Sequence, residues 1–177
     1  TPDYCKKLAE AFGVSVFFQW KDGGFKREML RCNERTAKIF YECPDNTIHS
    51  VGGEKGKYST RLKFPQPSPN LNVRWCSSYL KIDVCAAAIR NQERFNGLRT
   101  LVLSGERGEE SKQRAGYAIL EPDKSDLRHG KKIVRYVDRY RPIRDWTERR
   151  IWDLLEKYRV KPHPCYFMGF GRCSCKF

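Results

Sequence analysis

The segment that decides the fold is residues 101–115, which read LVLSGERGEESKQRA. A short apolar run ends at a turn bearing Gly105, and a charged stretch of helix-forming composition follows. This order predicts a buried strand, a loop and a helix. Open α/β sheets bind their ligands at such strand ends. Arg107 and Arg114 can both face an anion there, because the planar guanidinium suits phosphate or sulfate; the alternative is a surface turn with solvated charges.

The overall composition favours anionic partners. The chain has 177 residues, enough for one domain with a core, and its 35 Lys and Arg outnumber 21 Asp and Glu, which gives a formal charge of +14. Residues 124–161 alone carry 13 basic and six acidic side chains. Such an excess predicts binding to nucleotides, sulfate esters, nucleic acid or an acidic protein. No apolar run approaches the roughly 20 residues of a membrane span, so we expect no membrane partner and a cytoplasmic location.

The order of apolar patterns predicts an α/β domain. Helical and strand-like segments alternate, which is typical of helices packed on a mostly parallel sheet. We expect a three-layer α/β/α sandwich over residues 1–161, with a long loop or insertion at 43–72, and a Cys-rich C-terminal segment over 162–177. The expected strands are 14–20, 101–103 and 133–137. The expected helices lie near 2–12 (with Thr1 as N-cap), 25–35, 75–95 and 147–158, and a further helix follows the Gly105-bearing turn and ends near 118.

The eight cysteines are unevenly spread. Cys5 and Cys85 lie in expected helices among apolar residues, where a free buried thiol is the ordinary interpretation. Cys165, Cys173 and Cys175 instead lie close together near the C-terminal end. This pattern favours a reduced protein with a metal or cluster site over a set of four disulfides.

Four motifs occur in a set order along nearly the whole chain. They are Arg74-Trp75-Cys76 with Lys81, Gly105-Glu106-Arg107-Gly108-Glu109-Glu110-Ser111 with Arg114-Ala115, Arg141-Pro142-Ile143-Arg144-Asp145-Trp146-Thr147 leading to Ile151-Trp152, and Val160-Lys161-Pro162-His163-Pro164-Cys165-Tyr166. Each motif is weak alone, but together they resemble the phosphoadenosine-phosphosulfate (PAPS) reductase family of the adenine-nucleotide α-hydrolase-like (PP-loop) proteins. The first is similar to the Arg-Trp-Cys-x-x-x-x-Lys signature of the branch that contains sulfurtransferases and DNA-phosphorothioation enzymes.

Two features of that family do not occur in the sequence. The phosphate-cradling loop is of Ser-Gly-Gly-Lys-Asp-Ser type, and Gly52-Gly53-Glu54-Lys55 is a poor substitute because it lies in the expected long loop. The Glu-Cys-Gly-Leu-His segment, which carries the nucleophilic thiol of the reductases, is also missing. The chain therefore resembles a family member trimmed at both ends, without the first strand and its phosphate loop, and we expect little turnover from it alone.

The resemblance implies a substrate site at the phosphate or sulfate end of an adenylyl nucleotide. The residues that it places there are Arg74, Lys81, Arg107, Glu110, Ser111 and Arg114. Glu110 would orient one of the arginines, and the alternative for it is a helix-surface ion pair worth little. Lys81 and Arg74 are otherwise solvated cations. The catalytic residues stay unassigned.

The resemblance also implies a metal centre. Relatives in this branch hold a cluster through the cysteine of the Arg-Trp-Cys motif and a late Cys-x-x-Cys, whereas the late spacing here is Cys-x-Cys. The corresponding thiols would hold a 4Fe-4S cluster or zinc, and the alternative is four unrelated free thiols. They belong to Cys76, Cys165, Cys173 and Cys175. His163, between two prolines, is interpreted as structural.

Three functions are compatible with these motifs. The first is a reductase-like enzyme, in which a thiol attacks the sulfur of adenylyl sulfate or its 3′-phosphorylated form and the nucleotide leaves. The second is an ATP-dependent sulfurtransferase that modifies nucleic acid. The third is a non-catalytic module that binds nucleotide or nucleic acid. The implied partners are an adenine nucleotide and, for the sulfur step, a thioredoxin-like thiol donor or a cysteine desulfurase.

Overall fold

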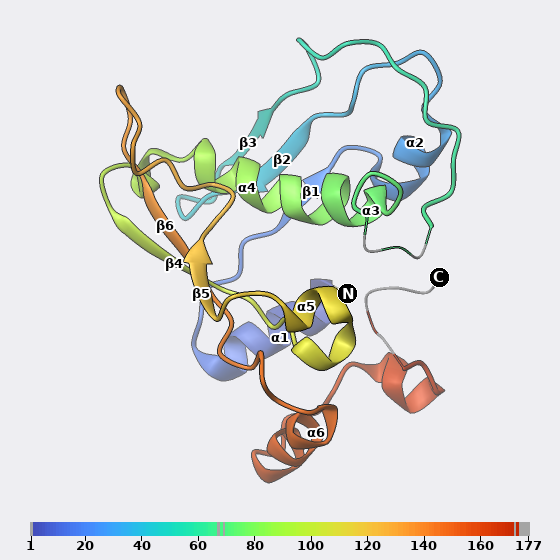
Figure 1. The fold of residues 1–177 in the computed structure, drawn as a ribbon, viewed down its shortest axis with the longest axis vertical. Coiled ribbons are helices and arrows are strands. Elements are labelled where there is room, and N and C mark those ends of the chain that lie inside the picture. Colours follow the sequence, from blue (N-terminus) through green and yellow to red (C-terminus); the bar gives the residue numbers. More distant parts are fainter. Residues whose placement is uncertain (1, 67, 69, 172, 174–177) are drawn as a thin grey trace.

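The computed structural model describes residues 2–66, 68, 70–171 and 173, which form two three-stranded sheets and the helices around them. Helices α1 (Pro2–Phe12) and α6 (Glu148–Lys157) lie in the lower half of Figure 1, away from the first sheet. Helix α1 begins at Pro2. Proline suits the first position of a helix, because the backbone N–H that it lacks would have no partner within the helix there. The expected N-cap, Thr1, lies outside the described residues.

The first sheet is antiparallel and consists of β1 (Gln19–Lys21), β2 (Ile39–Glu42) and β3 (Ile48–Val51). A tight turn joins β2 to β3: Asn46 takes a positive φ of 63°, and the backbone N–H of Thr47 donates to Asp45 Oδ1 at 3.0 Å. The long loop expected over 43–72 therefore contains a strand. Between β1 and β2, helix α2 (Gly24–Leu30) is shorter than the predicted 25–35.

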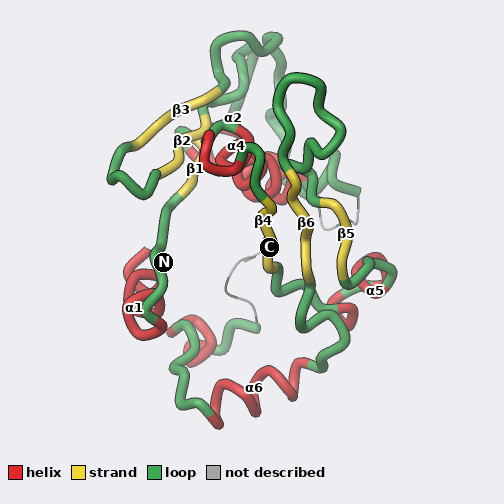
Figure 2. The backbone as a smooth tube through the Cα atoms, turned by 90° about the vertical axis from the view of Figure 1, so that its left-hand side faces the viewer, coloured by secondary structure: helices red, strands yellow, loops and turns green. Residues whose placement is uncertain are grey.

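A nearly continuous helical segment links the two sheets, as the sequence predicts for 75–95. It runs through α3 (Trp75–Ser77), a π-helical turn η1 (Ser78–Ile82) and α4 (Asp83–Arg90), and a short 3₁₀ turn η2 (Glu93–Phe95) follows. Trp75 is buried, and its Nε1 donates to the Lys63 carbonyl at 3.0 Å. Figure 2 shows α4 between the sheets. It contacts β1 and β2, and the Arg90 carbonyl accepts a hydrogen bond from Arg135, which directly precedes β6 of the second sheet.

The second sheet has the strand order β4 (Arg99–Leu103), β6 (Tyr136–Tyr140), β5 (Leu120–Pro122). Strands β4 and β6 pair in parallel, and β5 pairs with β6 antiparallel. The predicted α/β class is confirmed, but among the described strands the β4–β6 pairing is the one parallel pairing, so the expected mostly parallel sheet is mixed here. The strand predicted at 101–103 is present as part of β4, but its predicted burial was wrong, because Leu101 and Leu103 are 56% and 64% exposed and alternate with half-buried neighbours.

The basic run at 124–161 forms many internal ion pairs. Arg135 donates to the Ser125 carbonyl at 3.0 Å and to Asn96 Oδ1 at 2.9 Å, and it is almost completely buried. Arg139 pairs with the buried Asp123 at 2.5 Å. Some of this positive charge is therefore used inside the protein, beside the second sheet.

Helix α6 begins where the sequence predicts. Thr147 Oγ1 accepts the backbone N–H of Arg150 at 3.2 Å, which makes Thr147 its N-cap. A 3₁₀ turn, η4 (Pro164–Met168), follows in the C-terminal segment. Of the helices in the described part of the chain, none is both long and apolar enough to cross a membrane.

Candidate functional site

The loop after β4 is fixed in place by the segment after β6. Ser104 N donates to the Tyr140 carbonyl at 3.0 Å, and Gly108 N donates to the Arg144 carbonyl at 2.8 Å. A Cβ on Gly108 would lie 3.3 Å from Ala115 Cα and 3.4 Å from the Arg144 oxygen, so the close approach of these backbones favours glycine. The two motifs that contain Gly108 and Arg144 therefore fold as one unit.

Arg141 anchors the start of the same loop. Its Nε donates to Glu106 at 2.7 Å, its Nη2 to Glu121 at 2.7 Å and its Nη1 to the Ala118 carbonyl at 2.8 Å. The guanidinium also lies over the Tyr117 ring, 4.7 Å from the centroid. Burial opposes the charge of Arg141, but the hydrogen bonds to the two carboxylates outweigh burial and raise its pKa. The loop is therefore held by a charged group that stays ionised.

Glu110 lies between Arg107 and Arg114, the two arginines of the motif that begins at Gly105. A short 3₁₀ turn, η3 (Gly108–Glu110), and helix α5 (Lys112–Ala115) bring them together. Glu110 Oε1 accepts the backbone N–H of Arg107 at 3.2 Å, and Oε2 forms an ion pair with Arg114. Arg107 also pairs with Glu109 at 2.8 Å and with Glu148 at 3.7 Å. The two guanidinium groups are thus oriented by carboxylates that belong mostly to their own loop.

The π-helical turn places a second set of side chains opposite this loop. In η1 the backbone N–H of Asp83 bonds to the Ser78 carbonyl, five residues back. A π-helical turn takes more residues than an α-helical turn, so residues five apart come close to one face. Cys76 and Lys81 consequently line the same wall, with Arg74 at the N-terminal end of α3.

A cleft of about 790 Å³ separates the two sets. Five of the six predicted substrate residues line it, namely Arg74, Lys81, Arg107, Glu110 and Arg114. Ser111 does not: its Oγ accepts the backbone N–H of Arg114 at 3.2 Å and caps helix α5. The cleft gathers four cationic side chains from two motifs that lie far apart in the sequence.

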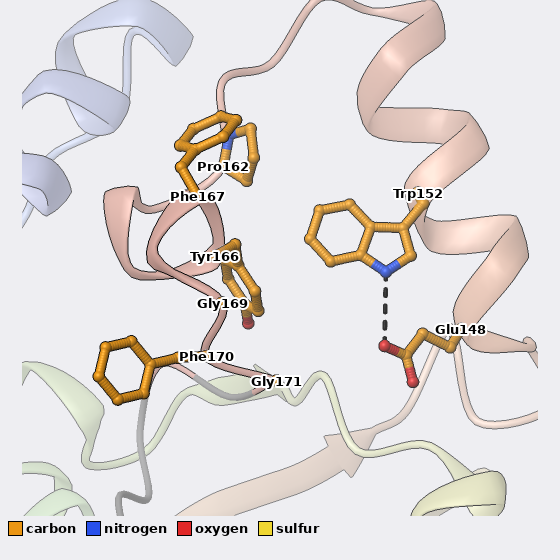
Figure 3. Close-up of a pocket in the computed structure, with 8 residues that line it drawn as sticks. All are labelled: Glu148, Trp152, Pro162, Tyr166, Phe167, Gly169, Phe170 and Gly171. Atoms are coloured by element: carbon orange, nitrogen blue, oxygen red, sulfur yellow. Dashed lines mark hydrogen bonds between the residues drawn. The ribbon is translucent and has the colours of Figure 1, made fainter.

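An aromatic pocket of about 380 Å³ adjoins the cleft, and both are lined by Glu148, Trp152, Tyr166 and Gly171. Figure 3 shows Trp152 of α6 opposite Tyr166 of η4, with their rings edge to face and 5.1 Å between centroids. Trp152 Nε1 donates to Glu148 at 3.4 Å. The sequence reasoning did not select Glu148, Trp152 and Tyr166 for the site. The sequence features that could have indicated them are the third motif for Trp152, the fourth motif for Tyr166 and, for Glu148, its position directly after the Thr147 cap.

The predicted cysteines separate into two places. The ligand atoms of His163, Cys165 and Cys173 all lie within 4.8 Å of one another. Burial and the hydrogen bond with Cys173 raise the pKa of the Cys165 thiol. Cys76 lines the cleft but is not part of this group, and Cys175 lies outside the described residues. Of the three described cysteines in the predicted set, two come together, and the described residues do not show the predicted four-thiolate arrangement.

Fold and cleft together define an α/β domain with a charged cleft at the end of a parallel strand. The phosphoadenosine phosphosulfate reductase domain matches residues 23–176, and the chain belongs to this nucleotide-binding family of the PP-loop superfamily. A curated relative from Escherichia phage 186, described as "Uncharacterized 37.8 kDa protein in gpa 5'region", is 30% identical over 111 residues. That match covers 60% of this chain and 30% of the relative. No solved structure matches significantly.

Proposed function

We propose that the cleft binds an adenylyl nucleotide (adenylyl sulfate, its 3′-phosphorylated form or ATP) by the sulfate or phosphate group, in a protein that reduces sulfate or transfers sulfur. The observation that carries this proposal is the convergence of Arg74, Lys81, Arg107 and Arg114 on one cleft. Family membership supports a nucleotide ligand. The adjoining pocket of Trp152 and Tyr166 supports it further, because aromatic rings give a purine a surface for stacking.

On binding, the ligand would replace the carboxylates of Glu109 and Glu148 as partners of Arg107. Glu109 and Glu148 are 53% and 61% exposed, so their ion pairs with Arg107 contribute little to stability. The Arg107 side chain is itself only 14% exposed. An oxyanion that replaces the exposed carboxylates would therefore form charge-assisted hydrogen bonds in a partly desolvated place, where they are stronger than in water.

Glu110 would have a different part in this exchange. It is three-quarters buried, caps the loop through the Arg107 backbone N–H and pairs with Arg114. We expect it to remain in place and to hold both guanidinium groups toward the anion, as a positioning residue. The chain's own residues thus supply binding and orientation of the nucleotide, and the sulfur step itself is left to groups that this proposal does not assign.

Isothermal titration calorimetry tests the proposal on the full chain. Adenylyl sulfate, its 3′-phosphorylated form, ATP and inorganic sulfate are titrated in turn into the unchanged protein, Arg107→Ala and Arg149→Ala. Arg149 is a matched control, because it is exposed and does not line the cleft. We expect at least one nucleotide to bind, with affinity lost in Arg107→Ala and kept in Arg149→Ala. Absence of heat from all three nucleotides, or equal affinities for the two variants, contradicts the proposal.

A further inference from the structure

We propose that the outer face of the first sheet, which carries Trp20 and Phe40, binds a single strand of nucleic acid together with the groove beside it. The observation that carries the proposal is a stacked pair of aromatic rings next to a groove lined by three cationic side chains. Aromatic rings stack on unpaired bases and cations contact phosphates, which is the usual composition of a surface for single strands. This surface lies apart from the nucleotide cleft, since the described residues that line the cleft include none of its members.

Strands β1 and β2 present the aromatic pair. Trp20 lies directly opposite Phe40 in the antiparallel ladder, and their rings stack at an interplanar angle of 17° with 5.6 Å between centroids. Successive side chains of a strand alternate between its faces, so the neighbouring Tyr41 points the other way. Its hydroxyl donates at 3.2 Å to the carbonyl of Asn91, directly after α4. Helix α4 therefore covers the inner face, and Trp20, which is 39% exposed, lies on the outer face.

The outer face continues into a groove of about 300 Å³. The ladder extends by one pair beyond β1, because Asp22 N donates to the Lys38 carbonyl at 2.9 Å. These two residues follow Trp20 and precede Phe40 by two positions, so alternation places their side chains on the same face, and both line the groove. The other cations of the groove lining are Arg27 and Arg35. A strand whose bases stack on the ring pair can therefore direct its phosphates into the groove.

The loop after β3 adds a third ring to the groove. An isolated antiparallel bridge joins Glu34 and Ser59 through backbone hydrogen bonds of 3.0 and 3.2 Å, which fixes this loop against the segment before β2. Directly before the bridge, Tyr58 is 62% exposed and lines the groove. The Arg35 guanidinium lies over its ring, 4.9 Å from the centroid. A ring that is already held in place loses little conformational entropy when a base stacks on it.

The ion pairs at the groove can open for a phosphate. Arg27 pairs with Asp22, and Lys38 pairs with Glu54 at 2.7 Å, and the two carboxylates are 52% and 72% exposed. Such exposed pairs contribute little to stability, so their replacement by a phosphate costs little. The ring pair favours a single strand over a duplex, because the bases of a duplex are already stacked on one another. It also favours nucleic acid over an acidic protein, since an acidic protein would use the cations alone.

Fluorescence anisotropy with a labelled oligothymidylate of about 15 nucleotides tests the proposal on the full chain, and oligouridylate and a DNA duplex of the same length are the other probes. We expect a single strand to bind more tightly than the duplex, and the tighter of the DNA and RNA strands identifies the ligand. Trp20→Ala should lower that affinity at least about fivefold with the same salt dependence, and Trp20→Phe, which keeps a ring, should retain most of it. Lys38→Ala should reduce the slope of log affinity against log salt by about 0.7, since one phosphate contact is lost.

Tyr158→Ala and Arg149→Ala are the matched controls, because both side chains are exposed and neither lines the groove. Both variants should bind the strand as the unchanged chain does, and circular dichroism verifies the folding of every variant. Three results overturn the proposal: no binding of either single strand, equal affinity for strand and duplex, or an equal loss in Arg149→Ala, which would assign binding to the basic run at 124–161. Sedimentation adds a fourth, namely a dimer that Trp20→Ala dissociates in a chain that binds no strand.

Discussion

The arginines of the cleft differ from Arg135 and Arg141, which flank strand β6, in what their side chains contact. Two of the three carboxylates that Arg107 contacts, Glu109 on its own loop and Glu148 at the start of α6, are more than half exposed, and the third, Glu110, is 23% exposed. Arg141, only 5% exposed, contacts two carboxylates and a backbone carbonyl that join three segments. Arg135 contacts two backbone carbonyls and an amide oxygen inside the protein.

This difference distinguishes arginines that are available to bind a ligand from arginines that stabilise the fold of the same basic protein. Removing an exposed partner costs little, so an ion pair such as Arg107–Glu148 can open for a ligand. Removing a buried guanidinium leaves several acceptors without donors, and that cost is large. Net charge alone does not distinguish these cases, because both kinds of arginine count equally toward +14.

The largest effect is expected for Arg141→Ala. The substitution removes the donor of Glu121 and of the Ala118 carbonyl and leaves Glu106 with only the Ser104 hydroxyl, so the free energy of unfolding should fall by about 3 kcal/mol. Urea denaturation followed by circular dichroism measures it, with Arg149→Ala as the exposed control, expected to change it by about 0.5 kcal/mol or less. If the two variants unfold at the same urea concentration, Arg141 does not hold the loop as we describe.

The second prediction concerns Arg107→Ala, which should show the opposite profile. We expect its free energy of unfolding to change by less than about 1 kcal/mol, since its partners are mostly exposed. Loss of charge-assisted hydrogen bonds to the anion should weaken nucleotide binding tenfold or more, about 1.5–3 kcal/mol. Denaturation and calorimetry on the same preparation measure both. A variant that loses stability and keeps affinity would remove the distinction between the two arginine sets.

A third, smaller effect is expected at low pH. Hydrogen bonds from Arg128 and from the backbone N–H of Val137 lower the pKa of Asp126 to about 2. Because the native pKa lies below the usual value of about 3.9, the stabilisation is complete above about pH 5 and is lost as the pH falls toward 2. We expect Asp126→Asn to cost about 1 kcal/mol at pH 7 and little at pH 2. Denaturation midpoints at several pH values measure this, and an equal cost at both ends contradicts it.

Much of the cleft could be predicted from local sequence. The apolar run, the Gly-bearing turn and the paired arginines indicated a ligand site at a strand end, and Arg107 and Arg114 do line the cleft. Arg74, Lys81 and Glu110, which also line it, were predicted only through the family resemblance. Ser111 is the exception, because a serine before a helix is equally suited to an N-cap, and that is its contact here. Sequence alone does not tell these two uses apart.

Other features depend on geometry that local sequence does not reveal. On a regular α-helix, residues five apart such as Cys76 and Lys81 need not share a face, but the π-helical turn η1 brings both to one wall. The exposed face of β4 could not be predicted, since an apolar run looks alike whether or not the described chain covers it. His163 was interpreted as structural because it lies between two prolines. Its approach to Cys173 follows the chain reversal at Gly169, which local sequence does not reveal.

The smallest expected effect belongs to Glu148→Gln and tests the exchange of carboxylates directly. Glu148 Oε2 lies 3.7 Å from Arg107, and the side chain is 61% exposed, so the free energy of unfolding should change by about 0.5 kcal/mol or less. If the carboxylate competes with the ligand, its neutralisation should tighten nucleotide binding about twofold, and the gain should shrink as salt screens the charges. Calorimetry at low and high ionic strength measures this. Weaker binding in Glu148→Gln would mean that Glu148 orients Arg107 toward the anion instead of competing with it.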